Sequence, residues 1–147
     1  MRWKWNNVPI PQAHVIGLVI GAILQIFFSQ KLYQSPWLGY GIGWPLIVIG
    51  IGICVWSVIE AKEMDIADPD TLLKSGPYAF SRNPMYVGWT LIYLGISLAA
   101  NSFWILALLP IVLLYIHFMD IRKEEQYLDE QFGDEYRQYR KQVRRYF

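Results

Sequence analysis

Long apolar stretches without formal charge dominate the chain as far as residue 119. Two of them run from Val8 to Gln30 and from Trp37 to Ile59. A third runs from Asn83 to Met119, with Asn101-Ser102 near its middle. A bilayer core of roughly 30 Å needs about 20 helical residues, so the third stretch is long enough for two spans and a tight turn. The pattern predicts one domain, residues 1–147, with transmembrane helices near 10–29, 37–60, 85–100 and 103–120. The last two are short, so we expect them to tilt or to thin the bilayer locally.

The pattern changes beyond Met119 from uniformly apolar to amphipathic. Apolar and aromatic residues now recur every three or four positions between charged ones, which is the period of one helical face: Leu128, Phe132, Tyr136, Tyr139 and Val143. This predicts a surface helix over 121–145 that lies along the membrane or folds over the mouth of the bundle. The expected fold class is therefore all-α, a polytopic membrane helical bundle with an amphipathic C-terminal helix.

The positive charges indicate which way the bundle faces. Four spans place both termini and the 61–82 segment on one side of the membrane. That side holds nearly all lysines and arginines, including Arg2, Lys4, Lys62, Lys74, Arg82, Arg122, Lys123 and the cluster from Arg137 to Arg145. The other side holds only Lys31. By the positive-inside rule, the sequence predicts an integral, multi-pass membrane protein whose termini and polar segments are cytoplasmic.

Composition narrows the possible functions further. Apolar residues make up 54% of the chain and the formal net charge is +1, so we expect a lipid bilayer as partner and no nucleic acid. The single cysteine, Cys54, excludes an internal disulfide and a cysteine-based zinc site, and we interpret it as a small buried hydrophobe. No second ligand stands at metal-binding spacing from His14 or His117, so we expect no metal. Both histidines are interpreted as helix-packing residues, with the lining of a cavity as the alternative for His117.

One polar segment precedes the third span. Gly76-Pro77 predicts a turn, and Pro84 suits the first turn of a helix, where its missing amide donor is not needed. Free backbone donors at that helix start could bind an anion such as a carboxylate, with Arg82 and Asn83 just outside. The alternative is a plain helix start with a snorkelling arginine.

A second polar feature, Glu124-Glu125, follows the fourth span. Adjacent acids on one helix point about 100° apart, so a solvated polar face is the alternative to a functional site. The antiparallel hairpin nevertheless returns this pair to the same side of the membrane as the first segment. We therefore expect Tyr78, Asn83, Tyr86 and Glu124 to surround one cavity.

Together these motifs resemble the isoprenylcysteine carboxyl methyltransferase family and its small bacterial and archaeal relatives, which share a core with phospholipid N-methyltransferases. The resemblance covers about half the chain, from Thr71 to the end. The matching motifs are Leu72 to Tyr78, Arg82 to Gly88, Glu124-Glu125, Leu128, Phe132-Gly133, Tyr136, Tyr139, Val143 and Arg145.

The resemblance implies a methyltransferase that uses S-adenosylmethionine, releases S-adenosylhomocysteine and receives a lipophilic substrate sideways from the bilayer. It implies cofactor contacts from Thr71, Leu72, Leu73, Tyr78, Asn83, Pro84, Met85, Tyr86 and Glu124. Glu124 would pair with the cofactor's ammonium group, while Tyr78 and Tyr86 would contact the adenine or the sulfonium.

One departure from the family pattern affects the substrate. The family arginine assigned to the substrate's carboxylate falls on Asp120 here, with Arg122 two positions away. This leaves a carboxyl, an amine or a thiol as the methyl acceptor. The candidate catalytic residues are Arg82, Asp120 and Glu125, with either acid as a proton acceptor for a neutral amine.

Two other functions fit parts of the pattern. Sterol reductases carry a similar run around Asn83 to Gly88 and use a nicotinamide cofactor, although they are larger and have more spans. A non-catalytic membrane protein that binds a partner or a lipid is the other alternative.

Overall fold

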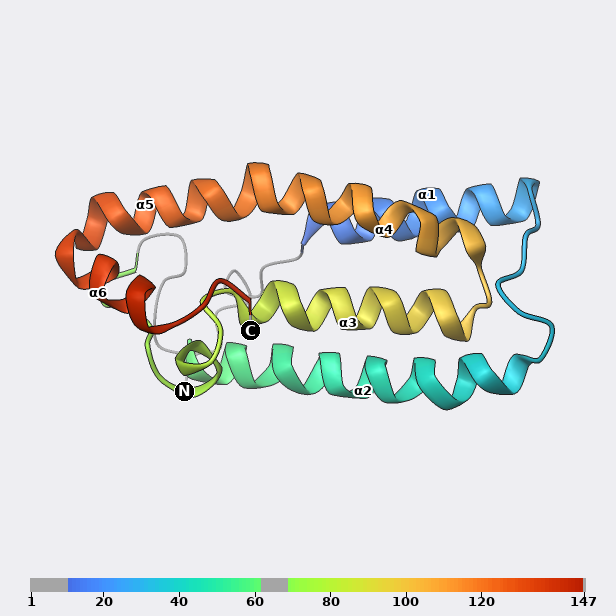
Figure 1. The fold of residues 1–147 in the computed structure, drawn as a ribbon, viewed down its shortest axis with the longest axis horizontal. Helices are drawn as coiled ribbons and strands as arrows, with labels where there is room; N and C mark the ends of the chain where they lie inside the picture. Colours follow the sequence, from blue (N-terminus) through green and yellow to red (C-terminus); the bar gives the residue numbers. More distant parts are fainter. Residues whose placement is uncertain (1–10, 62–68, 147) are drawn as a thin grey trace.

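The computed structural model describes residues 11–61 and 69–146, and all regular structure in these ranges is helical. The predicted cationic positions Arg2, Lys4 and Lys62 lie outside the described residues. The helices run in chain order along a long bundle (Figure 1): α1 Gln12–Phe27, α2 Pro36–Glu60, the short 3₁₀ helix η2 Gly76–Ala79, α3 Pro84–Ala99, α4 Phe103–Tyr115, the π-helix η3 Ile116–Ile121, α5 Arg122–Phe132 and α6 Asp134–Gln142.

Glycines bring α2 and α3 into close contact along most of their length (Figure 1). A Cβ atom on Gly43 would lie 2.7 Å from the backbone oxygen of Gly95, and one on Gly88 would lie 2.9 Å from that of Gly50. Small residues allow backbones in a membrane to approach closely, and dispersion forces then hold the pair. Gly41 differs from these glycines, because an added Cβ there would have no atom within 4 Å.

The second pair of helices, α1 and α4, packs in the same way. Gly17 lies against Val112 and Gly21 against Ile105. The buried core between α1, α3 and α4 consists of Tyr93, Ile105, Leu109, Val112, Ile116 and Ile121.

His14 is fully buried beside this core, and its Nε2 atom lies 3.1 Å from the hydroxyl of Thr90. Its position fits the interpretation of His14 as a helix-packing residue. Cys54 is half-buried against α3.

The tight turn between α3 and α4 falls at Asn101-Ser102, as the sequence predicts. Asn101 adopts a left-handed backbone conformation (φ 49°), which asparagine tolerates better than most residues. Its side-chain oxygen accepts hydrogen bonds from the backbone of Leu32 and Tyr33, and its amide donates to the Tyr33 carbonyl. Ser102 caps α4 by accepting a hydrogen bond from the Ile105 amide. This turn therefore ties together the two connections at one end of the bundle.

At the opposite end, α4 continues without a break through η3 into α5. Phe103–Phe132 forms one 30-residue helix that projects beyond the start of α3 (Figure 1). Gly133 then turns the chain, with φ 50° and ψ −119°, and α6 folds back toward the bundle. The single surface helix predicted over 121–145 is thus two helices, because a glycine with positive φ interrupts the helical backbone at Gly133.

Two helices, Pro36–Glu60 and Phe103–Phe132, are long and apolar enough to cross a membrane, and the apolar helices Gln12–Phe27 and Pro84–Ala99 are shorter. At 1.5 Å per residue, a 16-residue helix is about 24 Å long, somewhat less than a hydrocarbon core. Large apolar side chains point outward along the bundle, including Ile26 (78% exposed), Trp37 (80%) and Ile111 (63%). Such a surface is typical of a protein surrounded by lipid rather than by water.

Candidate functional site

A cavity of about 540 Å³ lies where the long helix leaves the bundle, beside the start of α3. Its wall combines the start of α1, the segment before α3, the first turn of α3, the α4–α5 helix and α6. The lining residues are Pro11, Gln12, Pro69, Thr71, Leu72, Leu73, Tyr78, Arg82, Asn83, Pro84, Met85, Tyr86, Asp120, Lys123, Glu124, Glu125, Tyr127, Leu128, Tyr136 and Tyr139. Its volume is within the range of about 300–1,000 Å³ typical of small-molecule sites.

The segment before α3 has the local structure expected from its turn residues. Gly76 adopts φ 58° and begins the 3₁₀ turn η2, in which Pro77 is buried. Asn83 precedes α3, and Pro84 occupies its first turn. The turn and the helix start together direct Tyr78, Asn83 and Tyr86 into one wall of the cavity.

A hydrogen bond joins the two sides of the cavity. The hydroxyl of Tyr86, in the first turn of α3, donates to Oε1 of Glu124 on α5 at 2.6 Å. The two residues are 38 positions apart in the chain, and the α3–α4 hairpin brings them together. The structure therefore has the single cavity between the two polar segments that the sequence predicts.

Glu124 forms no ion pair with any residue in the described part of the chain. Solvent reaches its side chain, but the surrounding protein removes much of its hydration, and this loss raises the pKa of the carboxyl above its usual value. The hydrogen bond from Tyr86 opposes the rise, and the nearby acids Asp120 and Glu125 add to it. A cationic ligand group beside Glu124 would restore the balance of charge.

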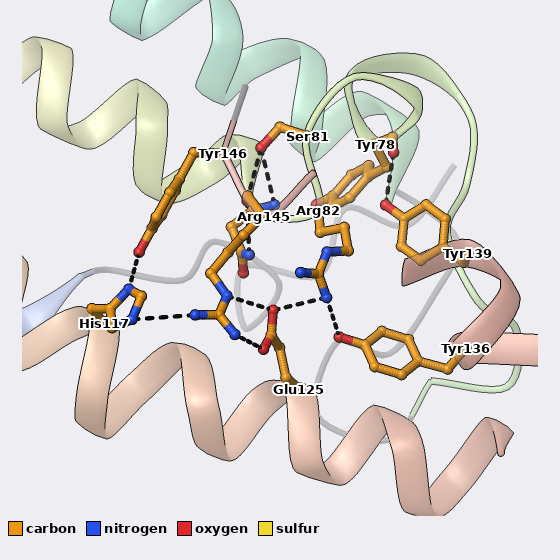
Figure 2. Close-up of polar contacts among 10 residues, drawn as sticks. Tyr78, Ser81, Arg82, His117, Glu125, Tyr136, Tyr139, Arg145 and Tyr146 are labelled. Carbon is orange, nitrogen blue, oxygen red and sulfur yellow. Dashed lines mark hydrogen bonds and ion pairs between the residues drawn. The ribbon is translucent and has the colours of Figure 1, made fainter. Parts of the chain in front are cut away.

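The neighbouring acid, Glu125, is buried and fully engaged by arginines, as Figure 2 shows. Its Oε1 lies 2.9 Å from both Arg82 NH1 and Arg145 Nε, and its Oε2 lies 2.5 Å from Arg145 NH2. Arg82 also donates from NH1 to the hydroxyl of Tyr136 at 3.1 Å. Both carboxylate oxygens of Glu125 therefore already accept hydrogen bonds or ion pairs, an arrangement that favours a structural role over proton transfer.

Two tyrosines on α6 close the cavity from the far side. Tyr136 and Tyr139 are 1% and 5% exposed, and the Tyr139 hydroxyl donates to the backbone oxygen of Tyr78 at 2.7 Å (Figure 2). Burial raises the pKa of Tyr139, and it raises that of Tyr78 to about 12, so both phenols are neutral near pH 7. The hydroxyl groups of Tyr136 and Tyr139 therefore bind α6 to the segment before α3.

All twelve residues selected from the sequence line this one cavity: Thr71, Leu72, Leu73, Tyr78, Arg82, Asn83, Pro84, Met85, Tyr86, Asp120, Glu124 and Glu125. Their roles in binding and catalysis stay predictions. The alternative suggested for His117 is wrong, because His117 is not among the residues that line the cavity. Its ring nitrogens instead lie within hydrogen-bond distance of Arg145 NH1 and of the Tyr146 hydroxyl (Figure 2).

The residues selected for the site did not include Tyr136, Tyr139 or Arg145, although all three belong to the motifs that carry the resemblance. For the two tyrosines, the spacing of aromatic residues identified a helical face without showing what that face contacts. The selection also missed Pro11 and Gln12, which line the cavity from the start of α1. These two residues belong to an apolar run with no polar motif.

The structure is a helical bundle with apolar helices of membrane-spanning length and a cavity of small-molecule size at one end. Comparison with known proteins shows its family: the phospholipid methyltransferase family matches residues 38–135, so the chain belongs to that family. The match extends from α2 to the start of α6 and includes most of the cavity wall.

Two individual relatives match the chain over shorter regions. The protein-S-isoprenylcysteine O-methyltransferase of Schizosaccharomyces pombe is 40% identical over 72 residues, which are 49% of this chain and 30% of that protein. An uncharacterized protein of Haemophilus influenzae is 45% identical over 60 residues, which are 41% of this chain and 84% of that protein. The match thus spans less than a third of the yeast enzyme. No solved structure matches the chain significantly.

Proposed function

We propose that the chain is an integral membrane methyltransferase that uses S-adenosylmethionine to methylate a lipid-soluble acceptor. Family membership supports the reaction class, and one observation carries the assignment of the site. Tyr86 and Glu124 meet at 2.6 Å across a cavity of about 540 Å³ at the polar end of an apolar bundle. In the proposed topology, such a cavity would be open to a water-soluble methyl donor and would lie beside the membrane that supplies the acceptor.

The proposal includes four membrane crossings, by α1, α2, α3 and the apolar part of α4. The 30-residue helix Phe103–Phe132 would cross with its apolar half and carry α5 into the cytoplasm. Support comes from the outward apolar side chains and from the accumulation of lysine and arginine at the cavity end. Both termini and the cavity would then be cytoplasmic.

The cavity offers complementary groups for the amino-acid part of the donor. Glu124, which has no cationic partner in the described ranges, suits an ammonium group. Arg82 lines the same cavity, its side chain is 9% exposed, and its Nε atom is buried without a hydrogen-bond partner among the described residues. A free guanidinium donor suits a carboxylate. The residues present therefore fit S-adenosylmethionine, with Thr71, Leu72, Leu73, Tyr78, Asn83, Pro84 and Met85 forming the remaining wall.

When bound, the donor supplies an electrophilic methyl group on a sulfonium. The protein's contribution would be orientation and exclusion of water rather than covalent catalysis. Tyr86 would hold Glu124 through their hydrogen bond, and Tyr78 and Met85 would present low-polarity surface around the reacting centre. Glu125 would act on Arg82 through the ion pair, keeping the guanidinium at the cavity wall.

The acceptor would be a carboxyl, an amine or a thiol on a lipophilic molecule that enters from the bilayer. Asp120 lines the cavity at the end of the apolar part of the long helix, close to where such a molecule would arrive. A neutral amine must lose a proton after methylation, and Asp120 is better suited than Glu125 to accept it, because Glu125 is occupied by two arginines.

A ligand-dependent melting experiment tests the proposal. In detergent, S-adenosylhomocysteine at about 100 times its dissociation constant should raise the melting temperature by about 5 °C or more. NADPH at the same concentration should leave it unchanged. Stabilisation by NADPH alone would favour a nicotinamide-dependent reductase, and no stabilisation by either would favour a non-catalytic binding protein. Either result would overturn the proposed function.

A further inference from the structure

The last described residues form a strap that crosses the start of α3. We define the strap as residues 143–146, which follow the end of α6 in extended and irregular conformation. Its backbone accepts hydrogen bonds from the segment before α3. Arg144 O accepts from the amide of Arg82 at 3.0 Å, and Arg145 O accepts from Asn83 Nδ2 at 3.1 Å and from Ser81 Oγ at 3.3 Å. The strap therefore contacts Arg82 and Asn83, two residues of the cavity wall.

The side chain of Arg145 attaches the strap to the long helix. Nε and NH2 contact the two oxygens of Glu125 at 2.9 and 2.5 Å, a two-point pairing that fixes the orientation of both groups. NH1 lies 3.2 Å from Nε2 of His117, and Nδ1 of His117 lies 2.6 Å from the Tyr146 hydroxyl (Figure 2). Arg145 is thus held by residues of η3 and α5, while its backbone holds the segment before α3.

Glu125 links this attachment to the cavity. The same carboxylate that binds Arg145 also pairs with Arg82, and Tyr136 holds Arg82 from the other side. Loss of the Arg145 side chain would free one oxygen of Glu125 entirely and leave the other with Arg82 alone. It would also release the strap whose backbone holds the Arg82 amide and the Asn83 side chain.

We propose that Arg145 is a positioning residue for the cofactor cavity: docking of the strap, through the Arg145–Glu125 pair, fixes Arg82 and Asn83 in the geometry that binds the methyl donor. The inference rests on the proposed function for its ligand. Because coupling between two binding events is reciprocal, a bound donor in turn stabilises the docked strap.

Arg145→Ala and Arg145→Lys test the proposal, with Lys141→Ala as the control. Lys141 is an exposed residue of α6 that forms no ion pair within the described ranges, and its removal lowers the net charge by the same amount. We expect R145A to weaken S-adenosylhomocysteine about tenfold or more in a calorimetric titration, within the usual range of coupling between sites. R145K keeps the charge but cannot form the two-point pairing, so its affinity for S-adenosylhomocysteine should fall by a smaller factor than that of R145A. The control should bind like the parent chain.

Three further measurements separate positioning from mere stabilisation. In R145A the KM for the methyl donor should rise by a larger factor than kcat falls. Amide hydrogen exchange should become faster in the peptide containing Arg82 while the interior of α3 stays protected. Guanidinium ion at low millimolar concentration should restore part of the lost affinity in R145A and do nothing in the control.

Faster exchange at Arg82 with unchanged affinity and KM in R145A would overturn the proposal, because the strap would then be a structural cap only. Unchanged exchange at Arg82 would overturn it as well. The exchange experiment needs no ligand. If the parent chain fails to bind S-adenosylhomocysteine, the proposed function fails on that binding result, and exchange still reports whether Arg145 holds Arg82. Should R145A not fold, the comparison of R145K with the control decides in the same way.

Discussion

Replacement of Glu124 by alanine is the sharpest perturbation of the proposed cofactor site. The residue contacts Tyr86 at 2.6 Å and forms no ion pair in the described part of the chain. In the proposed complex its carboxylate pairs with the donor's ammonium group. Alanine would remove that partner while leaving the buried pair of Glu125 and Arg82 in place.

The size of the effect follows from the kind of contact. A hydrogen bond to a charged group contributes about 1.5–3 kcal/mol, and each 1.4 kcal/mol corresponds to about tenfold in affinity. Solvent reaches the Glu124 side chain, which screens the interaction and places the expected effect at the lower end. We expect E124A to bind S-adenosylhomocysteine roughly 10- to 30-fold more weakly than the parent chain.

Isothermal titration of S-adenosylhomocysteine into the protein in detergent measures this loss. The matched control is Glu130→Ala on the same helix, whose exposed carboxylate accepts a hydrogen bond from Gln126. E130A should bind like the parent chain. Equal affinity of E124A and E130A would refute the pairing of Glu124 with the ammonium group.

Three further predictions concern the protonation of Glu124, the hydroxyl of Tyr86 and the packing of α2 against α3. Because the pKa of Glu124 is raised, part of the Glu124 population is protonated at a pH where an ordinary glutamate is charged. The affinity for S-adenosylhomocysteine should therefore rise as the pH increases from the ordinary glutamate pKa through the raised one, and E124Q should lose this component. Tyr86→Phe removes the hydroxyl that orients Glu124 and should weaken the same ligand by about 2- to 10-fold in titrations beside the parent chain. Gly43→Ala places a methyl group 2.7 Å from the Gly95 oxygen and should destabilise the bundle by about 1–3 kcal/mol, seen as a lower melting temperature in detergent, whereas Gly41→Ala should have no such cost. Equal melting temperatures for these two variants would show that α2 and α3 are not closely packed.

Most of the helices could be predicted because each depends on the apolar and charged residues within its own segment. Charge-free runs fix where apolar helices lie, and Asn101-Ser102 marks the turn between α3 and α4 within a residue of its observed position. The ends of the last predicted segment were not predictable in the same way. Alternating charged and aromatic residues indicate a helix but not where it bends, and the break at Gly133 depends on one backbone angle.

The site was predictable as a set of residues and less so as a set of contacts. Pro84 marked a polar helix start, and Glu124-Glu125 marked a polar helix end on the same side of the bundle. The helical hairpin between them predicted that these two polar segments lie close together. The partners of Glu125 could not be derived, because Arg145 reaches it only after α6 folds back. Sequence spacing carries no information about such a return of the chain.

Methyl transfer to a lipid is the most direct measure of the proposed activity. The purified protein would be incorporated into vesicles of a total membrane lipid extract and supplied with S-adenosylmethionine carrying a labelled methyl group. We expect the parent chain and E130A to transfer label into the fraction extracted by organic solvent, and E124A to transfer far less. The vesicles should also contain lipids with carboxyl, amine and thiol groups, and the protein should first be shown to bind S-adenosylhomocysteine. If the lipid fraction then contains no more label than protein-free vesicles do, the proposed methyltransferase activity is contradicted.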